Sequence, residues 1–206
     1  MFDNSLLISV RRFTRYIGLN SVIANLLSPD IYESKFSDYM LSLLRDGDIV
    51  WDVGAHVGFY SSLFCLSVGH LGHVYCFEPN ANCLPNLQAL AAANPQMHII
   101  TSALGGSTGF SDFVVSDDST TCKVTSQLST TSANQVYVVT SDDFLNTEPK
   151  ALPNFIKIDT EGFEYQIVSG MPSLLHNEKL RCIAIEVHFR ELELRGEVDK
   201  VSVIIN

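Results

Sequence analysis

The chain of 206 residues is long enough for one domain with a full core and too short for two ordinary ones, because a domain usually takes about 100–200 residues. With 46% hydrophobic and only 17% charged residues, its apolar surface excludes intrinsic disorder, a collagen-like repeat and a disulfide-held miniprotein. The net charge of -10, from 13 basic and 23 acidic residues, repels phosphate backbones, so we do not expect nucleic acid as a partner.

The N-terminal residues 1–30 are expected to form a helical extension, with Leu6–Ile17 as an amphipathic helix, and residues 31–206 to form the main domain. The N-terminus lacks the long apolar core and the small-residue cleavage site of a signal peptide. The longest apolar run, Leu63–Phe77, is broken by polar residues and is shorter than the about 20 apolar residues of a membrane-spanning helix. We therefore expect neither export nor an integral membrane segment.

Cysteine usage bears on the compartment, because the five cysteines are odd in number and form no C-x-x-C pair. Most lie in apolar runs, where a thiol behaves as a small hydrophobe. Buried structural thiols are favoured over a redox or metal role, since reactive thiols need an electropositive setting. This usage predicts a reducing, cytoplasmic compartment. The cysteines are Cys65, Cys76, Cys83, Cys122 and Cys182.

The first half of the main domain alternates helices with apolar strands. Helical spacing over Phe36–Leu44 ends at Gly47, and the strand Ile49–Val53 then leads through a glycine turn into a helix that reaches about Ser67. The strands His73–Phe77 and Met97–Thr101 flank a helix that ends at Asn94 and Pro95. Continuous apolar strands that alternate with helices predict a doubly wound, mostly parallel α/β sheet with helices on both faces.

The second half contains a break in this pattern. A strand over Phe110–Val115 precedes the polar tract Ser116–Asn134, which is either a flap over the site or a long hairpin connection. The sheet is expected to resume at Val136–Val139, Phe155–Asp159 and Cys182–Val187. The chain then stops within the apolar segment Val201–Asn206, so the C-terminal strands of such a sheet are expected to be missing.

The glycine turn after the first apolar strand is a cofactor site by position. Glycines at the carboxyl end of a parallel strand let a ligand approach the backbone. The spacing differs from the G-x-G-x-x-G of dinucleotide enzymes, and Asp52 would repel a pyrophosphate, which disfavours a nucleotide-binding oxidoreductase. Glu78 ends the next strand, where a carboxylate reaches the hydroxyls of a ribose in nucleotide-binding α/β folds.

A cluster of charges follows the strand that begins at Phe155. Lys157 interrupts this apolar strand, and Asp159, Glu161 and Glu164 follow within a few positions. Carboxylates this close raise one another's pKa unless a cation or hydrogen bonds compensate. Asp159 and Glu161 are favoured as site residues, whereas for Glu164 a site role and an ordinary first-turn helix acid are equally good interpretations.

Six motifs in this order resemble the FkbM-type family of S-adenosylmethionine-dependent methyltransferases, over about Ile31 to His188. The K-I-D-x-E-G-x-E block is the specific one, whereas many methyltransferases share the first glycine motif. The motifs are D-V-G-A-H-V-G at Asp52–Gly58, F-E-P-N at Phe77–Asn80, A-L-G at Ala103–Gly105, T-S-D-D-F at Thr140–Phe144, K-I-D-T-E-G-F-E at Lys157–Glu164 and I-E-V-H at Ile185–His188.

The resemblance implies a Rossmann-like methyltransferase domain over residues 31–206 that moves a methyl group from S-adenosylmethionine to a hydroxyl of a sugar, glycan or natural product. The resemblance implies that Asp159 and Glu161 lie on the acceptor side. A sugar hydroxyl needs a base to remove its proton, and the candidates are Asp159, Glu161, His188 and His56, in that order. The first three are the predicted catalytic residues, although a packed, structural histidine is an equally good interpretation of His188. A divalent metal is compatible with this chemistry but not implied, and Asp159 would be its ligand. The alternative is a catalytically inactive methyltransferase-like domain that binds a partner. The implied cofactor-binding residues are Asp52, Gly54, Ala55, His56, Gly58, Glu78, Pro79, Asn80, Ala103 and Leu104.

Overall fold

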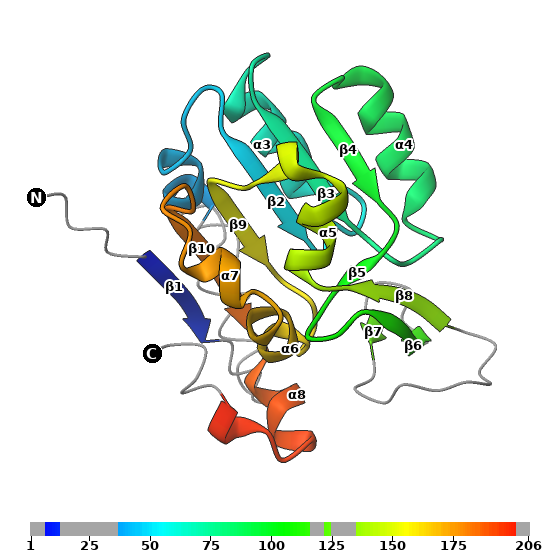
Figure 1. The fold of residues 1–206 in the computed structure, drawn as a ribbon. Coiled ribbons are helices and arrows are strands. Elements are labelled where there is room, and N and C mark those ends of the chain that lie inside the picture. Colours follow the sequence, from blue (N-terminus) through cyan, green and yellow to red (C-terminus); the bar gives the residue numbers. More distant parts are fainter. Residues whose placement is uncertain (1–6, 13–36, 116–121, 125–134, 201–206) are drawn as a thin grey trace, which may run out of the picture.

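A computed structural model describes residues 7–12, 37–115, 122–124 and 135–200, and its centre is a six-stranded parallel sheet (Figure 1). The strand order is β1-β10-β9-β2-β3-β4, with every neighbouring pair parallel. This confirms the predicted doubly wound α/β class. The strands are β1 (Leu7–Arg12), β2 (Ile49–Val53), β3 (His73–Phe77), β4 (Met97–Ile100), β9 (Phe155–Ile158) and β10 (Cys182–Val187).

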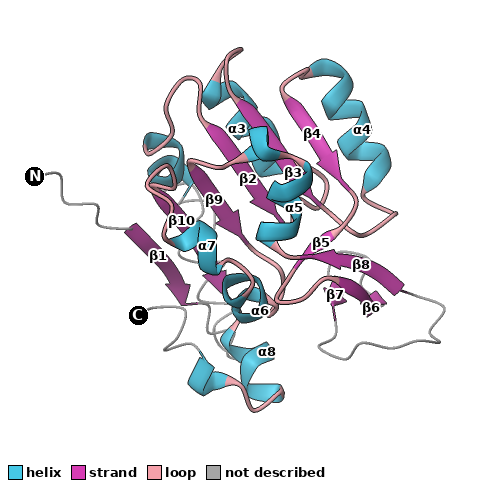
Figure 2. Cartoon of the chain, viewed as in Figure 1, coloured by secondary structure: helices cyan, strands magenta, loops and turns pink. Residues whose placement is uncertain are grey.

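Helices cover both faces of this sheet, as the cartoon in Figure 2 shows. Trp51 and Val53 of β2 lie in a core cluster with residues of α5, α6, α7 and α8, whereas Val50 lies in the opposite cluster with residues of α3 and α4. Because β2, β3, β9 and β10 are buried on both faces, their sequences are largely apolar runs without alternation. The helices are α3 (Phe59–Val68), α4 (Leu84–Ala93), α5 (Ser141–Thr147), α6 (Glu164–Ser169), α7 (Pro172–Leu175) and α8 (Phe189–Leu194), with the short 3-10 turns η1 (Pro149–Ala151) and η2 (Val198–Lys200).

A second sheet lies beside the carboxyl ends of the parallel strands (Figure 1). Its order is β5-β8-β6-β7, with β5 parallel to β8 and the other pairs antiparallel. The prediction that β8 continues the main sheet is therefore wrong. In β8, Val136 and Val138 are buried while Tyr137 is 43% exposed, which is the alternation of a strand with one open face. The strands are β5 (Ala103–Leu104), β6 (Gly109–Val115), β7 (Cys122–Val124) and β8 (Gln135–Val139).

The N-terminal helix prediction is also wrong where the structure describes it. Residues Leu7–Arg12 form β1, which pairs in parallel with β10 from Leu7 opposite Cys182 to Arg12 opposite Val187. Without β1, β10 would be an edge strand, and pairing with its unpaired backbone groups outweighs a local helical preference. The remainder of the predicted extension lies outside the described residues.

Two further predicted segments fall partly or wholly outside the described residues. In the polar tract Ser116–Asn134, β7 forms a hairpin partner of β6, and the rest of the tract lies outside the described ranges. The predicted apolar end at Val201–Asn206 also lies outside them. The predicted helix over Phe36–Leu44 is observed at residues 37–42. Within the described part of the chain, we find no helix with the length and apolar character needed to cross a membrane.

Candidate functional site

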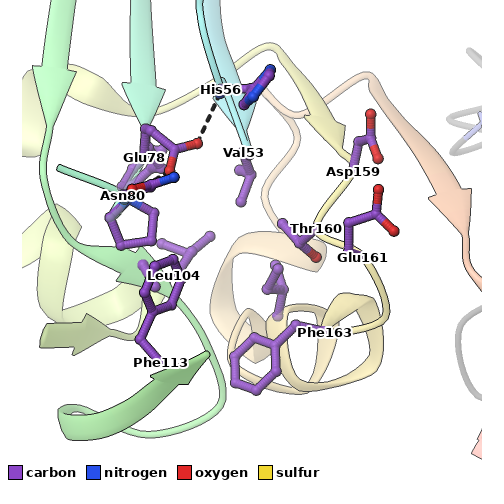
Figure 3. A pocket seen from close by; sticks show the side chains of 15 residues that line it. Val53, His56, Glu78, Asn80, Leu104, Phe113, Asp159, Thr160, Glu161 and Phe163 are labelled. Atoms are coloured by element: carbon purple, nitrogen blue, oxygen red, sulfur yellow. Dashed lines mark hydrogen bonds between the residues drawn. The ribbon is translucent and has the colours of Figure 1, made fainter. Parts of the chain in front are cut away.

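A pocket with a volume of about 180 Å³ opens at the carboxyl ends of β2, β3 and β9, between the main sheet and the second sheet. In Figure 3, Glu78 and Asn80 lie on one side of this pocket and Asp159, Thr160 and Glu161 on the other. Ligands of open parallel sheets bind at this edge. The pocket is lined by Val53, Gly54, His56, Phe77, Glu78, Pro79, Asn80, Ala103, Leu104, Phe113, Asp159, Thr160, Glu161, Phe163 and Ile167.

The turn after β2 forms one wall through two left-handed residues. Gly54 has φ 80° and His56 has φ 51°, a conformation that residues other than glycine seldom adopt. A Cβ on Gly54 would overlap the backbone carbonyl of Asp159. The glycine is therefore needed first for the close approach of the segment after β9, and this approach brings Asp159 to the pocket.

Glu78 is a buried carboxylate at the end of β3, with 6% of its surface exposed. Its Oε2 accepts the His56 N–H and its Oε1 accepts the Asn80 N–H, each at 2.8 Å (Figure 3). Burial raises the pKa of Glu78, while the two N–H groups act in the opposite direction. Because a carboxylate accepts at about four lone-pair positions, capacity for two hydroxyl donors remains on this side chain.

Asp52 lies beneath the pocket and does not line it. Its side chain is fully buried, where Oδ2 accepts the Ser61 hydroxyl at 2.6 Å and Oδ1 lies 3.3 Å from Lys157 Nζ. The same Nζ lies 3.4 Å from Asp159 Oδ2 and donates to the Gly54 carbonyl at 3.3 Å. Burial opposes the ammonium charge, but the two aspartates hold the pKa of Lys157 above its ordinary value. Asp52 thus acts on the site through Lys157.

Ala55 and Gly58 also lie outside the pocket lining. Ala55 is buried in the core cluster that contains α3 and α4. A Cβ on Gly58, whose φ is 88°, would meet the side chains of Leu87 and Leu90. These two positions of the glycine motif therefore support the packing of α4 against the turn.

The acceptor side combines two pocket carboxylates with an imidazole behind them. His188 does not line the pocket, but its Nε2 lies 3.4 Å from Glu161 Oε2 and 3.7 Å from Asp159 Oδ1. Its Nδ1 lies 3.0 Å from Oε1 of the fully buried Glu164. Although burial disfavours the charged ring, the three carboxylates raise the pKa of His188 to about 9. The structure thus brings together all three residues that were predicted to be catalytic.

The structure also bears on metal binding and on the cysteines. Among the residues that the structure describes, no group of three or more His, Cys, Asp or Glu side chains is arranged to hold a metal ion. Four thiols are buried and form no disulfide, and burial raises their pKa where a shift is resolved, to about 11 for Cys65 and Cys182 and also upward for Cys76. The buried structural interpretation is confirmed for Cys65, Cys76, Cys83 and Cys182.

Pro79, Ala103 and Leu104 were predicted as part of the lining, whereas the aromatic side chains of the pocket were not. Phe113 comes from β6 and Phe163 from the segment before α6, and Figure 3 shows both with Leu104 below the polar residues. A phenylalanine in an apolar strand gives no signal that separates a pocket wall from ordinary core. The usable signal was membership of a motif: Thr160 and Phe163 lie within the motif at Lys157–Glu164, whereas Phe113 lies in none.

Comparison with known proteins adds a family match and a curated relative. The model of the methyltransferase FkbM domain matches residues 52–203. The hexuronic acid methyltransferase AglP of Haloferax volcanii is 23% identical over 149 residues, which cover 72% of this chain and 59% of that protein. The chain therefore spans less than two thirds of the length of this relative.

Two solved structures show weaker likeness. The precorrin-6Y C5,15-methyltransferase of Geobacter metallireducens has a TM-score of 0.46 and 15% identity, over 82% of this chain and 70% of that one. The C-terminal domain of the corresponding enzyme from Rhodobacter capsulatus has a TM-score of 0.30 and 25% identity, over 34% of this chain and 39% of that one.

Proposed function

Since this chain belongs to the FkbM family of methyltransferases, we propose that it uses S-adenosylmethionine to methylate a hydroxyl oxygen of a sugar, glycan or natural product. The observation that carries the proposal is the buried carboxylate of Glu78 at the end of β3, which lines a pocket and retains acceptor capacity for two hydroxyls. Vicinal hydroxyls are what the ribose of this cofactor offers.

The composition of the pocket fits this cofactor. Among the described residues, the lining contains three carboxylates, Glu78, Asp159 and Glu161, and no Lys or Arg, which suits a ligand with a sulfonium and an ammonium group. The apolar side chains of Leu104 and Phe113 offer a surface for a planar ring. When bound, S-adenosylmethionine supplies a methyl group that is already activated by its positive sulfur.

The residues of the chain then have two tasks at the acceptor. They hold a hydroxyl oxygen in line with the methyl group, and positioning of this kind supplies a large share of the rate, with effective molarities of about 10⁵ M or more. They also take the hydroxyl proton, because a sugar hydroxyl is a poor nucleophile until it is deprotonated. Asp159 and Glu161 are the carboxylates at the pocket that serve as proton acceptors, and His188 lies directly behind them.

The proposed class of acceptor is based on the relative AglP. AglP is named a hexuronic acid methyltransferase, and a sugar acid offers the hydroxyls that this site requires. Methyl glucuronide is therefore our probe for the acceptor, since it is a simple hexuronic acid glycoside.

Titration calorimetry with S-adenosylmethionine and methyl-transfer assays on methyl glucuronide test the proposal with two variants. Glu78→Ala should lose at least about tenfold in cofactor affinity, because hydrogen bonds to a charged group contribute about 1.5–3 kcal/mol each. Asp159→Asn should bind the cofactor nearly as the wild type does. Its turnover should fall by about 10²–10⁴, as is typical when acid–base catalysis is lost.

Circular dichroism of both variants is the control for folding. A wild-type chain that does not bind S-adenosylmethionine would contradict the proposed function and favour the inactive binding domain. Equal affinity in Glu78→Ala would remove Glu78 from the cofactor site, and equal turnover in Asp159→Asn would remove Asp159 as the base.

A further inference from the structure

Glu164 is, like Asp52, a fully buried carboxylate near the pocket that does not belong to the pocket lining. It is the first residue of α6 and has no exposed surface. Its Oε1 accepts the Gly162 N–H at 2.8 Å and lies 3.0 Å from Nδ1 of His188. The Thr160 N–H lies 3.4 Å from the same oxygen. One buried oxygen therefore joins the segment after β9 to the residue after β10.

The first of these links fixes the backbone around Glu161. Glu161 has φ 54°, in the left-handed region, and the next residue, Gly162, has φ 99°. The N–H groups on either side of Glu161, from Thr160 and Gly162, both point at Glu164 Oε1. A turn that is strained for a residue other than glycine persists only where its surroundings hold it, and Glu164 Oε1 accepts from the N–H groups on both sides of Glu161.

The second link fixes the orientation of the imidazole. With Nδ1 directed at Glu164, the opposite nitrogen of His188 faces Glu161 at 3.4 Å and Asp159 at 3.7 Å. A buried carboxylate that accepts from one ring nitrogen determines which way the other nitrogen points. The raised pKa of His188 agrees with a ring that donates on both sides at neutral pH.

We propose that Glu164 is the positioning residue of the acceptor side, acting through His188 and through the turn at Glu161 to direct the carboxylates of Glu161 and Asp159 at the pocket. It does not touch the acceptor itself. The inference rests on the proposed function for its catalytic consequence, but the orientation of His188 and the turn can be measured without turnover.

Two variants separate the two links. Glu164→Gln keeps a carbonyl oxygen that accepts from the Gly162 N–H but removes the charge from the bond to His188. Glu164→Ala removes both. In NMR spectra at pH 7, the His188 Nδ1 proton should show the downfield shift of a charge-assisted bond in the wild type and lose it in both variants. Exchange of the Gly162 amide hydrogen should speed up only in Glu164→Ala.

Glu193→Gln is the matched control, because Glu193 is an exposed acid on the neighbouring helix α8. It should leave both NMR signatures unchanged. If Glu164→Ala does not fold, the spectrum of Glu164→Gln alone decides the link to His188. An unchanged His188 signal in a folded Glu164→Gln variant overturns the proposal.

Kinetics then test the catalytic consequence. On methyl glucuronide, Glu164→Gln should lower kcat by about tenfold or more with the KM for S-adenosylmethionine unchanged, as expected for an oriented proton-transfer group. In a His188→Gln background the same change should have little further effect, because both act through one imidazole. Equal kcat in Glu164→Gln overturns the proposal. If the wild type binds S-adenosylmethionine but does not methylate methyl glucuronide, the proposed hexuronic acid acceptor is wrong. The NMR results then still decide the role of Glu164.

Discussion

The charged side chains around the pocket alternate in sign from the centre of the sheet to its rim. Lys157 lies between Asp52 and Asp159, and Asp159 lies between Lys157 and His188. His188 in turn lies within 4 Å of Glu161 and Glu164. Each carboxylate of the K-I-D-x-E-G-x-E block therefore has a cation beside it. The three acids that fall within six positions of the sequence therefore face basic groups as well as one another.

The raised pKa of His188 predicts a pH dependence of stability. Its folded-state pKa is about 9, above the ordinary value of 6.5, so the charged ring favours the folded state. This contribution is complete below about pH 6.5 and is lost as the pH rises through 9. We expect the free energy of unfolding, measured by denaturant titration, to fall by on the order of a few kcal/mol across this range.

His188→Gln should flatten this slope, because the titrating group is gone. His176→Gln is the control, since His176 is an exposed histidine whose Nδ1 bonds the Pro172 carbonyl. A slope of equal size in His188→Gln would show that the pH dependence arises elsewhere.

At the scale of elements, the sequence was most informative where strands are buried on both faces. The strands β2, β3 and β10 were predicted with their observed bounds, because an uninterrupted apolar run has few other interpretations. β1 was missed because its pairing with β10 is a contact about 175 residues away along the chain, which local periodicity does not report. Similarly, β8 was assigned to the wrong sheet because the exposed Tyr137 continues an apolar run.

The residues of the candidate site also differ in how well the sequence predicted them. Glu78, Asp159 and Glu161 were predicted because polar groups at strand ends stand out from apolar runs, and all three line the pocket. Asp52 and Gly58 are the first and last residues of the glycine motif, but they are buried beneath or beside the pocket. A sequence motif contains the residues that support a site as well as those that form it. Phe113 arrives from the second sheet, whose placement the sequence did not reveal.

The close approach of the turn after β2 to the segment after β9 predicts a specific stability effect. Gly54→Ala places a Cβ against the backbone carbonyl of Asp159 and also strains a φ of 80°. We expect a loss of about 2–5 kcal/mol in the free energy of unfolding, from the left-handed conformation together with overpacking. Thermal and denaturant unfolding would measure it.

Gly196→Ala is the matched control for this loss. Gly196 has a similar φ of 66°, but a Cβ there meets nothing within 4 Å. It should therefore cost only the conformational part, about 1–2 kcal/mol. If the two variants lose the same stability, the approach of the Asp159 backbone is not what requires glycine at position 54.

For the whole molecule, the pocket lies where two sheets of different character meet. β2 and β9 occupy the middle of the six-stranded sheet and have strands on both sides and helices on both faces. The indole of Trp51 also donates to the Ala151 carbonyl at 2.7 Å within this core. The second sheet has an open face, on which Phe110 is 58% exposed and Tyr137 43% exposed. The polar wall of the pocket thus belongs to the fully covered sheet, and Leu104 and Phe113 belong to the sheet with an open face.

This difference predicts the order in which the two sheets open. Local opening is easiest where few apolar contacts hold a strand, so amides of β6 and β8 should exchange their hydrogens at least about tenfold faster than those of β2 and β9. Native-state hydrogen exchange read by NMR at neutral pH would measure this, with β3 as an internal control because it lies between β2 and β4 in the main sheet. β3 should behave as β2 does. Equal protection of β6 and β9 would mean that the two sheets open as one cooperative unit, and the apolar wall of the pocket would then be as rigid as its polar wall.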